Sequence, residues 1–165
     1  MKKLFLITII LLLQSFPSFG NPNGKGLICK YMEGEFVLPI PNLHMKIDKN
    51  GKKIPSEIGY FLNEDMVTPY MFRRNNDDIE LIGLNLPQYN FTTSNKTLEW
   101  GDTLLRHILD RKTLLLKVIR KTKVVSNYKC EVTDGKEVFI IQMKKIRYIY
   151  RSEVKEKLKK LENKI

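Results

Sequence analysis

Residues 104–119 read LLRHILDRKTLLLKVI. Two apolar runs of strand length, Leu104–Leu109 and Thr113–Ile119, flank the polar turn formers Asp110-Arg111-Lys112. Apolar runs of this length on either side of a short polar turn are typical of a β-hairpin. The segment therefore predicts two neighbouring antiparallel strands in the later half of the chain.

Similar extended segments lie on both sides of this hairpin, separated by turn residues roughly every eight to twelve positions. We expect strands at Lys25–Tyr31, Leu43–Ile47, Ile58–Leu62, Met66–Phe72, Ile79–Leu84, Thr97–Trp100, Tyr128–Thr133 and Glu137–Met143, an edge or loop at Phe36–Pro41 and a loop at Leu86–Ser94. Asp134-Gly135 gives the strongest hairpin signal, because Asp-Gly suits a type I′ turn. No helical pattern separates the strands, so the sequence predicts a mainly β fold, an antiparallel meander that forms a barrel or a two-sheet sandwich.

The pattern changes at residues 152–165, which predict a basic amphipathic helix. Ser152 is a suitable N-cap, and apolar residues then recur at helical spacing. These apolar residues are Val154, Leu158, Leu161 and Ile165, and the lysines around them are Lys155, Lys157, Lys159, Lys160 and Lys164. The lysines are candidate contacts for an anionic partner. Packing of the apolar stripe against the β domain explains the same pattern with fewer assumptions, and both alternatives are open.

Residues 1–20 have the three-part layout of a cleavable secretory signal. Lys2 and Lys3 give a positive start, residues 4–13 are almost entirely apolar, and Ser18 and Gly20 place small residues at positions −3 and −1 of a cleavage site. The apolar run is shorter than the roughly 20 residues that a membrane-spanning helix needs. We therefore expect a periplasmic or secreted protein that begins at Asn21, with a β domain over 21–151 and a helix over 152–165.

Cys29 and Cys130 are the only cysteines. In an exported chain an even pair is expected to oxidise. Each cysteine alternates with apolar neighbours on an expected strand, so both face the interior and a Cys29–Cys130 disulfide is predicted. No CxxC motif or metal-ligand cluster is present, so redox catalysis and a metal site are not expected.

The chain is strongly basic. It has 29 basic and 18 acidic residues, and removal of Lys2 and Lys3 leaves 27 − 18 = +9. We interpret this charge first as a source of solubility and second as an indication of an acidic macromolecule or an anionic membrane surface as partner. Tyr148 and Tyr150 lie among basic residues, as in single-strand binders, but a half-buried strand gives the same alternation. An exported protein meets little nucleic acid, which is therefore not an expected partner.

Candidate catalytic residues are few. His44 and His107 are the only histidines, and no GxSxG motif accompanies them. Asp102 lies near His107 in the sequence, yet a lone histidine on a strand is more often a packing residue. Residues 75–78, Asn-Asn-Asp-Asp, are oxygen-rich, but they lack the ligand spacing of a calcium loop and fit a polar turn better. No catalytic residue and no cofactor is predicted.

Three segments together suggest a resemblance. They are Trp100, the LDRKTL run at residues 109–114, and Tyr128-Lys129-Cys130. This order resembles a group of small uncharacterised exported bacterial and phage-encoded β proteins, in which a tryptophan strand precedes an (Asn/Asp)-Arg-x-Thr-Leu turn and a Tyr-x-Cys strand. The segments 26–30 and 59–61 are similar to their openings. The resemblance implies a compact β domain with a Cys–Cys bridge, and it implies no activity.

Three functions follow from these observations. The first is an exported, non-enzymatic binding or interaction domain, whose interior either holds a small apolar ligand or is filled by side chains. The second is an envelope-associated protein that contacts anionic lipid or an acidic partner through its basic tail. The third is an extracytoplasmic hydrolase built around His107 and Asp102.

Overall fold

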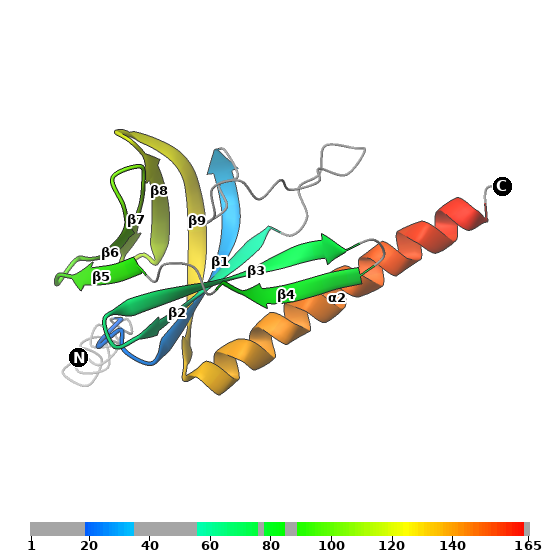
Figure 1. The fold of residues 1–165 in the computed structure, drawn as a ribbon, viewed down its shortest axis with the longest axis horizontal. Helices are drawn as coiled ribbons and strands as arrows, with labels where there is room; N and C mark the ends of the chain where they lie inside the picture. Colours follow the sequence, from blue (N-terminus) through cyan, green and yellow to red (C-terminus); the bar gives the residue numbers. More distant parts are fainter. Residues whose placement is uncertain (1–18, 35–55, 76–77, 85–88, 164–165) are drawn as a thin grey trace, which may run out of the picture.

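Nine strands and one long helix make up the described part of the chain, residues 19–34, 56–75, 78–84 and 89–163 of a computed structural model (Figure 1). The strands are β1 (Lys25–Gly34), β2 (Glu57–Asn63), β3 (Met66–Asn75), β4 (Asp78–Gly83), β5 (Tyr89–Thr93), β6 (Thr97–Gly101), β7 (Leu105–Asp110), β8 (Leu115–Arg120) and β9 (Lys123–Asp134), and the helix is α2 (Lys136–Glu162). The segments Phe36–Pro41 and Leu43–Ile47 lie outside the described residues.

The strands form a closed antiparallel barrel with one extra strand. Their order is β2-β1-β9-β8-β7-β6-β5-β3-β4, and an additional pairing of β2 with β3 closes the ring. Met66 and Val67 of β3 pair with β5, whereas its segment Tyr70–Asn75 pairs with β4. The second half of β3 therefore leaves the ring together with β4. The fold is a barrel rather than a sandwich, which confirms the first of the two predicted architectures.

The barrel interior is filled by large side chains. Alternate residues of the strands point inward, as the period-two pattern of a strand requires. The buried members of this core are Phe19, Leu27, Cys29, Ile58, Tyr60, Leu62, Val67, Leu98, Trp100, Leu109, Leu116, Val118, Tyr128 and Cys130. Aromatic rings occupy much of the interior, so the described barrel is a packed core.

The predicted disulfide is confirmed and joins two neighbouring strands. Cys29 of β1 and Cys130 of β9 are directly opposite in the antiparallel register, and both side chains are buried. Their sulfur atoms are bonded at 2.07 Å across a sequence separation of 101 residues. The bond therefore fixes the first strand of the barrel to the last.

The C-terminal helix is confirmed, but it begins earlier than predicted. The strand predicted at Glu137–Met143 is wrong, because α2 starts at Lys136 directly after Gly135, whose φ of 82° turns the chain out of β9. Ser152 is not an N-cap. It lies inside the helix, where its Oγ donates to the carbonyl of Tyr148.

Packing on the outside of the barrel explains why this segment is helical. Figure 1 shows α2 along one side of the barrel and extending beyond the strands toward the C-terminus. Its buried residues recur at helical spacing and form a second core with residues of β1, β2, β3 and β4. That core contains Ile28, Phe61, Phe72, Ile79, Phe139, Met143 and Val154.

Two glycines let the helix approach closely. A Cβ on Gly26 would lie 2.4 Å from a Phe139 ring carbon, and one on Gly59 would lie 2.7 Å from the tip of the same ring. Phe139 therefore lies directly against the backbones of β1 and β2.

The loop predicted at Leu86–Ser94 is also wrong in part, because Tyr89–Thr93 forms β5. Tyr89 and Phe91 are half-buried against the barrel core, while Asn90 and Thr92 are exposed. The alternation is that of a strand with one buried face.

Candidate functional site

His107, the histidine considered for catalysis, lies inside the barrel. Its ring stacks on Trp100 with centroids 5.2 Å apart and an interplanar angle of 5°, and it meets Tyr60 edge-on at 5.6 Å. Burial lowers the pKa of His107 from 6.5 to about 4, and the Trp100 backbone and the charge of Asp102 oppose this only in part. The imidazole is therefore neutral at pH 7 and enclosed by aromatic rings.

Asp102 does not complete a catalytic pair with His107. Its carboxylate is exposed and accepts hydrogen bonds at 2.8 Å from the backbone amides of Leu104 and Leu105, so it holds the turn between β6 and β7. A general base must reach its substrate within hydrogen-bond distance. A histidine that is 1% exposed, in the barrel interior, does not offer this. His44 lies outside the described residues.

Several buried polar atoms in the described residues have no hydrogen-bond partner. They are Tyr60 Oη, His107 Nδ1, Ser126 Oγ and Thr133 Oγ1. His107 and Ser126 belong to one row across the barrel, because both pair with Val118 of β8. Burial raises the pKa of Tyr60 well above its usual value, so this phenol remains uncharged. The barrel interior is a neutral, largely apolar environment with isolated polar atoms of Tyr60, His107 and Ser126, whereas Thr133 lies beside Phe139 under α2.

The oxygen-rich turn considered for calcium has a structural role at its described end. Asp78 contacts Arg151 at 3.0 Å and Arg147 at 3.5 Å, and it also accepts a hydrogen bond from the amide of Ile79. Asn76 and Asp77 lie outside the described residues. In the part of the chain that the structure describes, no group of three or more His, Cys, Asp or Glu side chains is arranged to hold a metal.

Polar contacts fix the rotation of α2 about its own axis. Arg147 donates to the carbonyl of Ile79, and the hydroxyl of Tyr150 donates to Glu57 on β2. Tyr150 Oη also lies 3.1 Å from Ser56 Oγ. Burial, together with the Glu57 carboxylate, raises the pKa of Tyr150 to about 12, so it stays a hydrogen-bond donor. One defined face of the helix is therefore turned away from the barrel.

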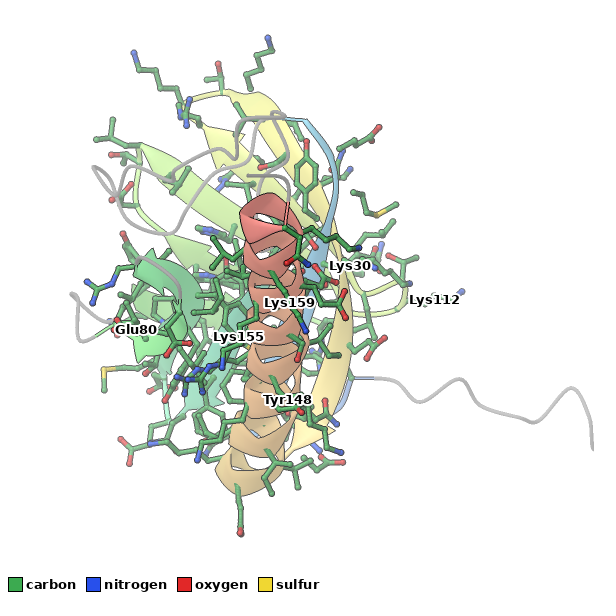
Figure 2. The ribbon with its side chains drawn as sticks, turned by 90° about the vertical axis from the view of Figure 1, so that its right-hand side faces the viewer. Lys30, Glu80, Lys112, Tyr148, Lys155 and Lys159 are labelled. Carbon is green, nitrogen blue, oxygen red and sulfur yellow. A yellow bond between two sulfur atoms is a disulfide. The ribbon has the colours of Figure 1, made fainter. Side chains whose placement is uncertain are left out.

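That outward face carries apolar, basic and acidic side chains, since Glu137 and Glu156 are also exposed on it, and we name its apolar and basic members the outer stripe. It consists of Val138, Ile141, Lys145, Tyr148, Ile149, Lys155 and Lys159. Tyr148 is 72% exposed and Ile149 is 56% exposed, high values for large apolar side chains. Figure 2 looks onto α2 and shows Tyr148, Lys155 and Lys159 along the helix. The apolar members occupy the first half of the helix, and two of the three lysines occupy the second.

The structure brings only part of the predicted lysine set into this stripe. Lys155 and Lys159 belong to it, and Lys160 is exposed beside it. Lys164 lies outside the described residues, and the side chain of Lys157 is not among those described. The sequence pattern does not reveal the apolar half, because Glu137–Met143 is predicted as a strand and the alternation around Tyr148 and Tyr150 also fits one. The spacing of Ile141, Tyr148, Lys155 and Lys159 by seven, seven and four residues is the helical signal that identifies it.

Within the described residues, no helix combines the length and apolar character that a membrane span requires. Comparison of the chain with known protein families, curated proteins and solved structures finds no match. The resemblance based on Trp100, residues 109–114 and Tyr128-Lys129-Cys130 therefore stays a prediction. What defines the class of this protein is its architecture, a disulfide-linked antiparallel β-barrel with a C-terminal helix on its wall.

Proposed function

We propose that this protein is an exported, non-enzymatic interaction domain that binds an anionic membrane surface through the outer stripe of α2. The observation that carries the proposal is the exposure of Val138, Ile141, Tyr148 and Ile149 on the same helix face as Lys155 and Lys159. A helix that lies in a membrane interface places apolar side chains below the head groups and basic ones among them. The barrel serves as the rigid support of this helix.

A lipid surface accounts for both halves of the stripe. An acidic polysaccharide or protein would pair with lysines alone, and it gives no reason for four large apolar side chains in solvent. Tyrosine is enriched at membrane interfaces because its ring is apolar and its hydroxyl is polar. The net charge of +9 after removal of residues 1–20 acts in the same direction over a longer range.

Export is supported by the cysteine pair. A buried disulfide between β1 and β9 forms and persists in oxidising compartments, whereas thiols in the cytosol are kept reduced. The expected secretory signal at residues 1–20 points to the same compartment. A packed interior with a neutral, enclosed His107 supports a role other than catalysis.

Vesicle binding tests the membrane proposal. The protein, recovered as processed by an exporting host, is mixed with phosphatidylcholine vesicles with or without phosphatidylglycerol, and the bound fraction is measured by sedimentation. We expect binding only to the anionic vesicles, weakening as salt rises. The double variant Lys155→Gln/Lys159→Gln should lose about 2 kcal/mol, roughly thirtyfold in affinity, at about 1 kcal/mol per lysine.

A second variant and a matched control separate surface binding from bulk charge. Tyr148→Gln/Ile149→Gln keeps the charge and should also weaken binding, because the apolar half no longer inserts. Lys117→Gln/Lys121→Gln removes two exposed lysines of β8 and its following turn, and it should weaken binding much less than the α2 lysine variant, because it changes only the long-range charge. Equal loss in the control, or no binding to anionic vesicles, overturns the proposal. Binding to polyglutamate but not to vesicles would assign the acidic-partner alternative instead.

A further inference from the structure

Phe19 and Gly20 occupy one end of the barrel. The Phe19 ring is 5% exposed and belongs to the core of the barrel. This end is bounded by neighbouring turns, since the amide of Arg111 in the β7–β8 turn donates to the carbonyl of Lys96 in the β5–β6 turn at 2.9 Å. A residue of the expected signal segment therefore fills a place in the interior of the barrel.

Arg111 holds the backbone of these two residues. Its Nε donates to the carbonyl of Phe19 at 2.9 Å, and its Nη2 donates to the carbonyls of Phe19 and Gly20, the latter at 2.6 Å. Its Nη1 is used by the barrel itself and donates to Thr93 Oγ1 at 3.1 Å and to the carbonyl of Ser94. The Arg111 guanidinium also lies 5.9 Å from the centre of the Phe19 ring. The Nη1 atom of the guanidinium is thus bound to Thr93 and Ser94 next to the β5–β6 turn. The Nε and Nη2 atoms point at the carbonyl oxygens of Phe19 and Gly20.

The chain after Gly20 is attached to the barrel by separate contacts. Asn23 Oδ1 accepts from the amide of Glu64 at 2.8 Å, and the amide of Gly24 donates to the carbonyl of Leu62 at 2.8 Å. The carbonyl of Gly24 in turn accepts from the amide of Gly135 at 3.0 Å. Cleavage between Gly20 and Asn21 would leave these contacts in place.

Cleavage at that bond would change the site in three ways. It removes the Phe19 ring from the core, it removes the Phe19 and Gly20 carbonyls that accept from Nε and Nη2 of Arg111, and it creates an α-ammonium group at Asn21. An α-amino group has a pKa of about 8 and is mostly charged at pH 7. Two cations would then border an apolar space of about the size of a phenylalanine side chain.

We infer that the processed protein binds a small monocarboxylate with an aromatic or short aliphatic group at this end of the barrel. The free edge of the Arg111 guanidinium matches the two oxygens of a carboxylate, and charge-assisted pairs of this geometry are stronger than neutral hydrogen bonds. The apolar group takes the place that Phe19 leaves. This inference rests on the export part of the proposed function, since processing opens the site.

Calorimetric titration tests the inference on protein recovered from an exporting host, after intact mass has established where the chain begins. The probe is 3-phenylpropionate, and its uncharged amide, 3-phenylpropionamide, is the matched control. We expect the acid to bind at least about tenfold more tightly than the amide, because only the acid pairs with the guanidinium. Arg111→Lys keeps the positive charge but lacks the planar guanidinium, and it should reduce the preference for the acid over the amide.

A chain that retains Phe19 and Gly20 provides the second control. This chain starts at residue 18, with Ser18→Met as its first residue, and has the disulfide formed. It should bind the acid at least about tenfold more weakly than the chain that begins at Asn21, because Phe19 occupies the site. Recovered protein that still begins before Asn21 overturns both export processing and this inference. Protein that begins at Asn21 but binds acid and amide equally, or no more tightly than the chain retaining Phe19, overturns the inference and leaves export standing.

Discussion

Acidification should destabilise this protein through His107. The imidazole is buried between Trp100 and Tyr60, and burial lowers its pKa from 6.5 to about 4. The unfolded chain therefore binds a proton at this residue at a higher pH than the folded chain does. The stabilisation is fully present above pH 6.5 and is lost as the pH falls toward 4.

The size of the effect follows from the shift. A difference of one pKa unit corresponds to about 1.36 kcal/mol, so the change from 6.5 to about 4 amounts to about 3 kcal/mol in full. By pH 5 the unfolded state is almost completely protonated at His107 and the folded state is not, which gives about 2 kcal/mol. This is a large share of the 5–15 kcal/mol typical of domains.

Urea denaturation at pH 7, 6 and 5, followed by circular dichroism, measures this loss. The comparison variant is His107→Phe, which keeps an aromatic ring beside Trp100 and cannot take up a proton. The carboxylates titrate alike in both proteins, so the difference between the two unfolding free energies isolates His107. Between pH 7 and pH 5 the parent should lose about 2 kcal/mol more unfolding free energy than the variant does. Parallel pH profiles would refute the burial argument.

Three further substitutions test the packing of the barrel and the helix by the same urea assay. Cys29→Ala/Cys130→Ala should lower the unfolding free energy by about 4 kcal/mol, because the disulfide closes a loop of about a hundred residues in the unfolded chain. An unchanged urea midpoint would contradict this. Phe139→Ala should cost about 3–5 kcal/mol, since the ring is fully buried between α2 and the barrel, and a cost below about 1 kcal/mol would mean that the helix does not pack there. Gly26→Ala should cost about 1–3 kcal/mol, because its Cβ would lie 2.4 Å from the Phe139 ring, and a stabilised variant would contradict that close approach.

Much of the barrel was predictable because its strands show one buried face. In the hairpin at residues 104–119, inward His107 and Leu109 alternate with other side chains, and Asp110 caps the turn by accepting from the amides of Lys112 and Thr113. The Cys29–Cys130 pair was predictable for the same reason, since both cysteines share faces with apolar neighbours. These are local signals, and the structure preserves them.

The helix over residues 136–151 was missed because its sequence satisfies two periods at once. Ile146, Tyr148 and Tyr150 alternate as in a strand, while Phe139, Met143, Ile146 and Tyr150 recur at helical spacing. Apolar residues on the outer stripe obscure the helical pattern. Gly135 added to the error, because a positive φ serves a type I′ turn and a strand-to-helix junction equally well. Burial of Phe139 against β1 and β2 resolves the ambiguity, and only the tertiary structure shows it.

The exposed apolar residues that obscure the helical pattern are also the reason to propose a surface function for the helix. A helix whose only task is to cover the barrel needs one apolar face, and residues such as Phe139 and Val154 provide it. Exposed Val138, Ile141 and Tyr148 add nothing to that packing. They lie instead beside lysines on a face held outward by the contacts of Tyr150 and Arg147 with the barrel. Lys155 and Lys159, from the predicted lysine set, thus form the basic half of the outer stripe. Its apolar half begins at Val138, inside the segment predicted as a strand.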